Sequence, residues 1–301
     1  MQTISIEELI TWNQEGLIPG PNESEVEYLK RVEFCLRLKQ HLTQELGTKL
    51  PFQESDMASQ TIFEPAWKMT FPLFGMRPSW VPLFFSNAKL TPWHGGCAWI
   101  FQLDENAPLA GLLQLRKSFA TNSLLARIYH RDELIAHELA HVGRMCYQEP
   151  KYEEFFAYQT SASWLRRKLG PIVQSSYESL IFVFALVFVL FFDLWMILAS
   201  ESPNTLTAWA IKAIPLAMLI YAGVRLFKRW QTLKKARQVM LQLVAKEEVA
   251  DQILYRLTDC EIESFAKMDG TSILEYFEVN KTRSLRVKML QAIYFENTRR
   301  C

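Results

Sequence analysis

Residues 131–142 read RDELIAHELAHV, and this segment predicts both a helix and a metal site. Its apolar residues recur at helical spacing and predict a helix that packs against a core, which argues against an ordinary surface helix. They are Leu134, Ile135, Leu139 and Val142. His137 and His141 are four residues apart, so their imidazoles project from one helix face and can share a metal ion. Glu138 lies beside the first histidine, where its carboxylate can take a proton from a metal-activated water.

The His-Glu-x-x-His pattern at 137–141 resembles the zincin metallopeptidases, and among them the gluzincins, whose third metal ligand is a glutamate on a following helix. The metzincin pattern is excluded, because it requires glycine and histidine where this chain has Arg144 and Tyr147. Glu154 begins the sequence Glu-Phe-Phe-Ala, which is similar to the gluzincin setting of the third ligand. The resemblance implies that His137, His141 and Glu154 hold Zn²⁺ and that Glu138 is the general base.

Two neighbouring glutamates are alternatives for the third ligand. Glu153 is the nearer alternative, although the residue three positions on is the bulky Phe156, and Glu149 lies in the turn before Pro150. The family often continues with an aspartate that orients a ligand, whereas this chain has Tyr158. This departure leaves the outer partner unassigned and is compatible with an inactive relative. The resemblance covers residues 90–170 only.

Other polar residues near the motif have more than one interpretation. Donors to the oxyanion of a tetrahedral intermediate could come from one histidine or three tyrosines, which are His94, Tyr147, Tyr152 and Tyr158. A structural hydrogen bond is the plainer expectation for each of them. His130 could orient or replace a ligand, but a polar group at a helix start is expected. Cys97 and Cys146 could be soft ligands, but buried thiols are expected.

Two segments are long and apolar enough to span a bilayer. Residues 180–199 are almost wholly Phe, Val, Leu and Ile, with only Asp193 charged, and residues 208–227 form a less pure second span with Lys212 inside it. Basic residues flank the pair on both outer sides, whereas the turn at 200–207 has none, so the positive-inside rule places both flanks in the cytoplasm. Asp193 and Lys212 lie at similar distances from the turn, and we expect them to form an ion pair within the hairpin.

The remaining chain is predicted to be mostly helical. Ser5 with Glu8 indicates a capping box, and Asn22 is expected to cap a helix that continues to residue 46. Residues 51–93, rich in Pro and aromatics, are expected to be loop-like. Residues 98–103 and 109–115 predict a β-hairpin, and either strand could be the edge strand to which a zincin substrate pairs. The chain after residue 230 is predicted to be helical, with a turn at Asp269-Gly270.

These observations together predict an α+β protein, mostly helical with a small antiparallel sheet. Its expected parts are an N-terminal helical segment (1–50), a zincin-like domain (51–170), a transmembrane hairpin (178–228) and a cytoplasmic helical segment (229–301). The expected function is that of a zinc peptidase at the cytoplasmic face of a membrane, acting on a polypeptide. The alternative is a catalytically inactive, membrane-anchored scaffold or regulatory protein with a vestigial or structural metal site.

Composition excludes other classes of function. The net charge of +1 does not support a nucleic-acid partner. The five scattered cysteines do not indicate a disulfide framework.

Overall fold

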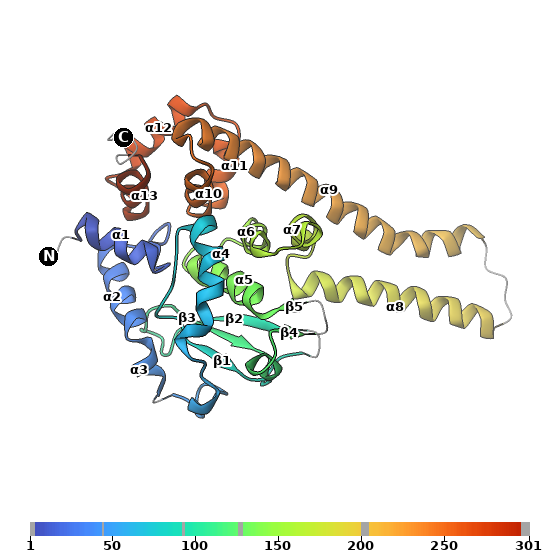
Figure 1. Ribbon diagram of the computed structural model, residues 1–301. Helices are drawn as coiled ribbons and strands as arrows, with labels where there is room; N and C mark the ends of the chain where they lie inside the picture. The colour runs from blue at the N-terminus through green and yellow to red at the C-terminus, as the bar shows by residue number, and fades with distance from the viewer. Residues whose placement is uncertain (1–3, 44, 92–93, 126–128, 200–204, 296–301) are drawn as a thin grey trace.

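A computed structural model describes residues 4–43, 45–91, 94–125, 129–199 and 205–295 of the chain. The α+β class is confirmed, because most described residues are helical, one small sheet lies in the body, and two long helices extend away from it (Figure 1).

The sheet has three strands in the order β1-β3-β2. The predicted hairpin is confirmed as β2 (Gly96–Phe101) and β3 (Ala110–Leu115), which pair antiparallel with Ala98 opposite Leu113. However, β1 (Leu83–Phe85) pairs with β3 in parallel, so the sheet is mixed, and the prediction of a purely antiparallel sheet was wrong. All of β3 is buried, whereas β2 is an edge strand.

The N-terminal helices begin where serine–glutamate capping boxes occur. Ser5 and Glu8 cap α1 (Ile6–Gln14) reciprocally, as predicted. The next helix is capped by Ser24, which forms a reciprocal capping box with Glu27, and not by Asn22 as predicted. The helix expected through residue 46 is interrupted at Arg37. The two pieces are α2 (Glu25–Leu36) and α3 (Leu38–Thr43).

The Pro-rich stretch expected to be loop-like contains a helix, α4 (Glu64–Phe74). Pro65 lies in its first turn. Backbone N–H groups there have no acceptor within the helix, so the missing N–H of proline costs no helical hydrogen bond. Gly75 ends the helix with a φ of 67°, a left-handed conformation that favours glycine. Shorter helical turns and a second strand pair complete this part of the chain. They are η1 (Glu54–Asp56), η2 (Gln60–Phe63), η3 (Lys117–Ala120), β4 (Leu124–Leu125) and β5 (Tyr129–His130).

The predicted motif helix is α5 (Arg131–Gly143), which packs against β2 and β3 on one side and against α4 on another. Its apolar stripe is buried in the core, as Ile135, Leu139 and Val142 show. Four short elements then lead to the long helices. They are α6 (Glu153–Ala157), η4 (Tyr158–Thr160), α7 (Trp164–Leu169) and η5 (Gly170–Ile172).

Two helices are long and apolar enough to cross a membrane, α8 (Ser176–Leu198) and α9 (Thr205–Val244). They lie side by side (Figure 1), and few residues of their apolar windows are buried (6% and 11%), unlike core helices of a water-soluble domain. The predicted ion pair is confirmed, since Lys212 Nζ lies 3.1 Å from Asp193 Oδ1. Most of the turn predicted at residues 200–207 lies outside the described residues, and its last three residues belong to α9.

The Asp193–Lys212 pair gives a prediction that needs no substrate. Asp193→Leu should leave Lys212 unpaired in the apolar span, at a cost of about 2.5–3.5 kcal/mol, and should reduce the amount of inserted protein. Asp193→Leu with Lys212→Leu should restore it. Quantitative immunoblotting of membrane fractions measures the effect. If the damage from the double change equals the sum of the two single ones, the two charges are not coupled.

The C-terminal segment packs onto the metal-motif helix. Tyr255 Oη donates to the carbonyl of Ala140 in α5 at 2.6 Å. In return, Arg144 donates to the carbonyls of Tyr255 and Leu257, and Tyr147 Oη donates to that of Arg256. These carbonyls lie at the C-terminal end of α10, which has negative partial charge and attracts guanidinium groups. The helices of this segment are α10 (Glu247–Tyr255), α11 (Asp259–Phe265), α12 (Gly270–Asn280), α13 (Leu285–Leu290) and a final turn, η6 (Gln291–Phe295).

The turn predicted at Asp269-Gly270 coincides with a helix boundary. Asp269 is the N-cap of α12, and its carboxylate accepts from the N–H of Ser272 at 2.8 Å.

Candidate metal centre

The three ligands expected from the sequence converge on one point. His137 and His141 project from one face of α5, and α6 brings Glu154 opposite them. The two Nε2 atoms are 3.4 Å apart, and each lies 3.7 Å from an oxygen of Glu154. All three ligand atoms therefore lie within 4.8 Å of one another, and this group could hold a metal ion.

The spacing of these atoms can be compared with that of known coordination geometries. Zinc bonds of about 2.0–2.1 Å in a tetrahedron place neighbouring ligand atoms about 3.3 Å apart. Ligands at right angles, as in an octahedral facial triad, would lie about 3 Å apart at similar bond lengths. In the structure the two histidine nitrogens are 3.4 Å apart, and they lie 3.7 Å from different oxygens of Glu154, so a modest inward movement would bring the three groups to either spacing.

Glu153, the alternative third ligand, lies outside the group formed by His137, His141 and Glu154. Its Oε1 lies 2.7 Å from Nδ1 of His141, on the side of the ring away from the other ligand atoms. The ring of His137 likewise has the backbone of Ala157 as a hydrogen-bond partner. Such partners fix the tautomer and orientation of metal-binding histidines. The family pattern often has an aspartate that orients a ligand at the position of Tyr158. In this chain Glu153 is the carboxylate placed to orient His141.

Removing the Glu153 carboxylate should weaken metal binding without abolishing it. Glu153→Ala is expected to lower the zinc affinity about 10–100-fold, because His141 loses the acceptor that orients it and raises its basicity. Competition against a chromogenic chelator measures the affinity. Glu33→Ala, at an exposed glutamate in α2, is the matched control. Equal affinities of Glu153→Ala and Glu33→Ala would remove Glu153 from the metal site.

The electrostatics of the cluster favour a bound cation. Burial lowers the pKa of His137 to about 3, and the neighbouring His141 adds to this effect. Burial opposes protonation of His141 too, but Glu153, Glu154 and Glu138 raise its pKa to about 9. The carboxylates therefore draw a positive charge into the site, which a divalent metal ion would supply.

Glu138 points from α5 toward the edge of the sheet. Its Oε2 accepts the backbone N–H of Ala98 in β2 at 2.8 Å, so this N–H points toward Glu138 and not toward β3. Burial raises the pKa of Glu138 to about 7, and the proximity of His141 opposes the rise. A carboxyl group with a pKa near neutrality can both accept and release a proton. Residues 98–103 and 109–115 were the two candidates for the edge strand to which a substrate could pair. The candidate that lies at the edge of the sheet is β2.

The structure separates the candidate oxyanion donors. His94 and Tyr158 line the cleft around the metal group, and the Tyr158 ring packs edge-on against His137 with centroids 4.8 Å apart. Gly170 allows this position, because a Cβ there would lie 2.3 Å from the Tyr158 ring. Tyr147 instead binds the C-terminal segment, and Tyr152 is buried against Phe155.

Two further residues considered as ligands or orienting groups also line this cleft. His130 lies there as the N-cap residue of α5. Cys97 lines the cleft as well, and burial raises the pKa of its thiol to about 11, which keeps it protonated.

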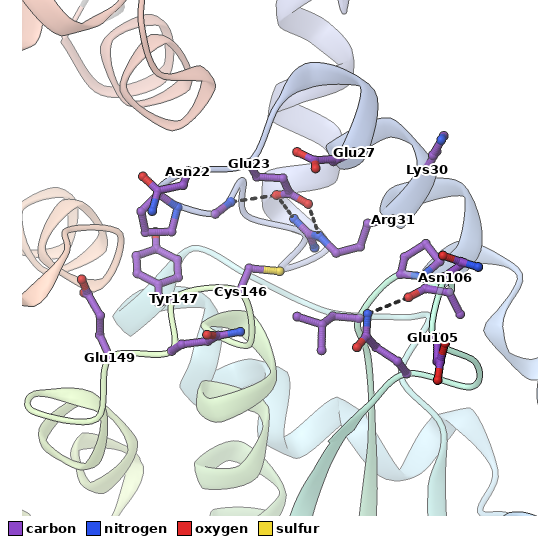
Figure 2. Close-up of a pocket in the computed structure, with 17 residues that line it drawn as sticks. Asn22, Glu23, Glu27, Lys30, Arg31, Glu105, Asn106, Cys146, Tyr147 and Glu149 are labelled. Atoms are coloured by element: carbon purple, nitrogen blue, oxygen red, sulfur yellow. Dashed lines mark hydrogen bonds and ion pairs between the residues drawn. The ribbon is translucent and has the colours of Figure 1, made fainter.

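Cys146 lies in another cavity of about 560 Å³, between the N-terminal helices and the loop after α5 (Figure 2). There its thiol faces the pair formed by Arg31 and Glu23, whose Nε and Oε1 are 2.7 Å apart. Burial raises the pKa of the Cys146 thiol to about 11. Cys146 is therefore not part of the metal group.

The cleft at the metal group has a volume of about 940 Å³ and extends well beyond the predicted residues. It is bounded by α7, η5 and the start of α8. No local sequence pattern predicts these walls, because they come from residues distant from the motif. They include Leu165, Arg166, Leu169, Val173 and Ser179.

Comparison of the chain with protein families, curated proteins and solved structures found no match.

Proposed function

We propose that the protein is a membrane-anchored zinc peptidase. The observation that carries the proposal is the convergence of His137, His141 and Glu154, whose ligand atoms lie within 4.8 Å of one another, with Glu138 beside them and a cleft in front. Two imidazoles and one carboxylate form a donor set typical of catalytic zinc, and zinc bound there would supply a Lewis acid that activates water and polarises a carbonyl.

The residues of the chain then have distinct tasks. Glu138 takes a proton from the attacking water and delivers it to the amine nitrogen that leaves. Glu153 holds the ring of His141 in place. The part of the β2 edge that is not occupied by the Ala98–Glu138 hydrogen bond pairs with an extended substrate backbone by β-addition, which presents a peptide carbonyl to the site. His94 and Tyr158 are the donors positioned to stabilise the developing oxyanion.

The basic flanks support a cytoplasmic position of the peptidase. Three cationic residues of α7 precede the first apolar helix, and α9 carries further ones after the apolar stretch. By the positive-inside rule the N-terminal and C-terminal parts both lie in the cytoplasm, and the metal group faces that compartment.

Metal analysis and a metal-removal assay test the proposal directly. We expect purified full-length protein in detergent to contain about one zinc per chain. A chelator should abolish cleavage of unfolded casein, and added zinc should restore it. A stoichiometric metal with no cleavage would support the inactive scaffold or regulatory protein, and iron in place of zinc would overturn the assignment of the metal.

A further inference from the structure

The cleft at the metal group continues to the beginning of the first apolar helix. His137 and Glu138 line one end, and Ser175 and Ser179, around the first turn of α8, line the other. The wholly apolar run starts at residue 180. The cleft therefore ends where α8 would enter the hydrocarbon core of a bilayer.

The wall between the two ends has the composition of a membrane interface. Leu165, Leu169 and Val173 line the cleft and are 57%, 47% and 46% exposed. The short helix α7, which carries Leu165 and Leu169, also carries Trp164 and the basic residues 166–168. Aromatic and basic side chains around exposed apolar ones are typical of a surface at the level of lipid headgroups.

This wall is fixed to both the metal helix and the hairpin. Arg166 forms an ion pair of 2.9 Å with Glu133 of α5. Trp230 of α9 donates to the carbonyl of Lys168, and Arg225 of α9 donates to that of Ile172. Arg225 also pairs with Glu178 in α8. The metal group and the membrane-proximal wall therefore keep a fixed spacing.

We infer that the substrates are membrane-anchored polypeptides, cut in the extended segment that follows or precedes their membrane span. This inference rests on the proposed peptidase function. Leu165, Leu169 and Val173 bind the apolar residues nearest the span, while the more distant residues pair with β2 and pass the metal group. A soluble polypeptide would leave this apolar wall uncovered and would gain nothing from it.

The test uses full-length protein in liposomes with one casein-derived sequence presented in three ways. The sequence is joined to a transmembrane helix by about five residues, joined by a flexible linker of about sixty residues, or left soluble. Both anchored probes share the concentrating effect of the bilayer, so their difference reports position alone. We expect the short-linker probe to be cleaved roughly tenfold faster than the long-linker probe.

Substitution of the wall provides the second measurement. Leu165→Gln with Leu169→Gln should bring the ratio of the two anchored rates to about one, with zinc content as a check of folding. Val279→Gln, at an apolar residue of α12 that is 54% exposed, should keep the ratio of the parent protein.

The outcomes distinguish the inference about the substrate from the proposed peptidase function. Equal cleavage of all three probes, or an unchanged ratio in the double variant, overturns the membrane-anchored substrate and leaves the peptidase intact. If the parent protein cleaves every probe no faster than Glu138→Gln does, the proposed peptidase function and the inference are both overturned.

Discussion

Replacing Glu138 by Gln is expected to reduce peptide hydrolysis about 10²–10⁴-fold and to leave zinc binding nearly unchanged. The amide cannot accept the proton of the attacking water at neutral pH. Its oxygen can still accept the N–H of Ala98, which Glu138 binds at 2.8 Å, so α5 and β2 keep their relative position. Casein cleavage and metal content, measured on the same preparation, give the two quantities.

Two controls define what this result means. His141→Ala should lose both zinc and activity, because it removes a ligand. Glu33→Gln, at an exposed glutamate of α2, should retain both. A Glu138→Gln variant as active as Glu33→Gln would contradict the assigned base, whatever the metal content.

The second large effect is expected at Arg144. In Arg144→Met the buried carbonyls of Tyr255 and Leu257 lose their donor, and Asp259, 3.9 Å away, loses its nearest guanidinium. We expect the free energy of unfolding to fall by about 3–5 kcal/mol, which corresponds to a decrease in melting temperature of roughly 10 °C. Thermal unfolding in detergent, followed by tryptophan fluorescence, measures this change.

The matched control for Arg144 is an exposed arginine. Arg37→Met, between α2 and α3, should change the free energy of unfolding by no more than about 0.5 kcal/mol. A similar small change in Arg144→Met would mean that the contacts of α5 with the C-terminal segment contribute little to stability.

Sequence reasoning succeeded where the pattern is local. The Ser5–Glu8 capping box and the motif helix are encoded within a few residues. The Asp193–Lys212 pair was predictable because an antiparallel hairpin fixes the depth of each residue from its distance to the turn. The convergence of Glu154 with the histidines followed from one short pattern, because α6 comes soon after α5 in the chain.

Sequence reasoning failed where an element is short or where interacting residues are distant in sequence. The three residues of β1 carry too little pattern to be recognised among prolines, and only their pairing with β3 makes them a strand. The role of Glu153 depends on which nitrogen of His141 it faces, which no sequence pattern encodes. The hydrogen bond from Tyr255 to Ala140 joins residues that the two apolar helices separate.

The length of α9 has a mechanical consequence. Its 40 residues form one helix about 60 Å long, roughly twice the thickness of the hydrocarbon layer. The apolar half, which contains Pro215, and the half that packs against α10 and α11 belong to one continuous helix and therefore tilt together. A tilt of about 10° displaces one end of a helix of this length sideways by about 10 Å relative to the other. In a membrane, the thickness of the bilayer would influence that tilt and thereby change the direction in which the cleft faces over the lipid surface.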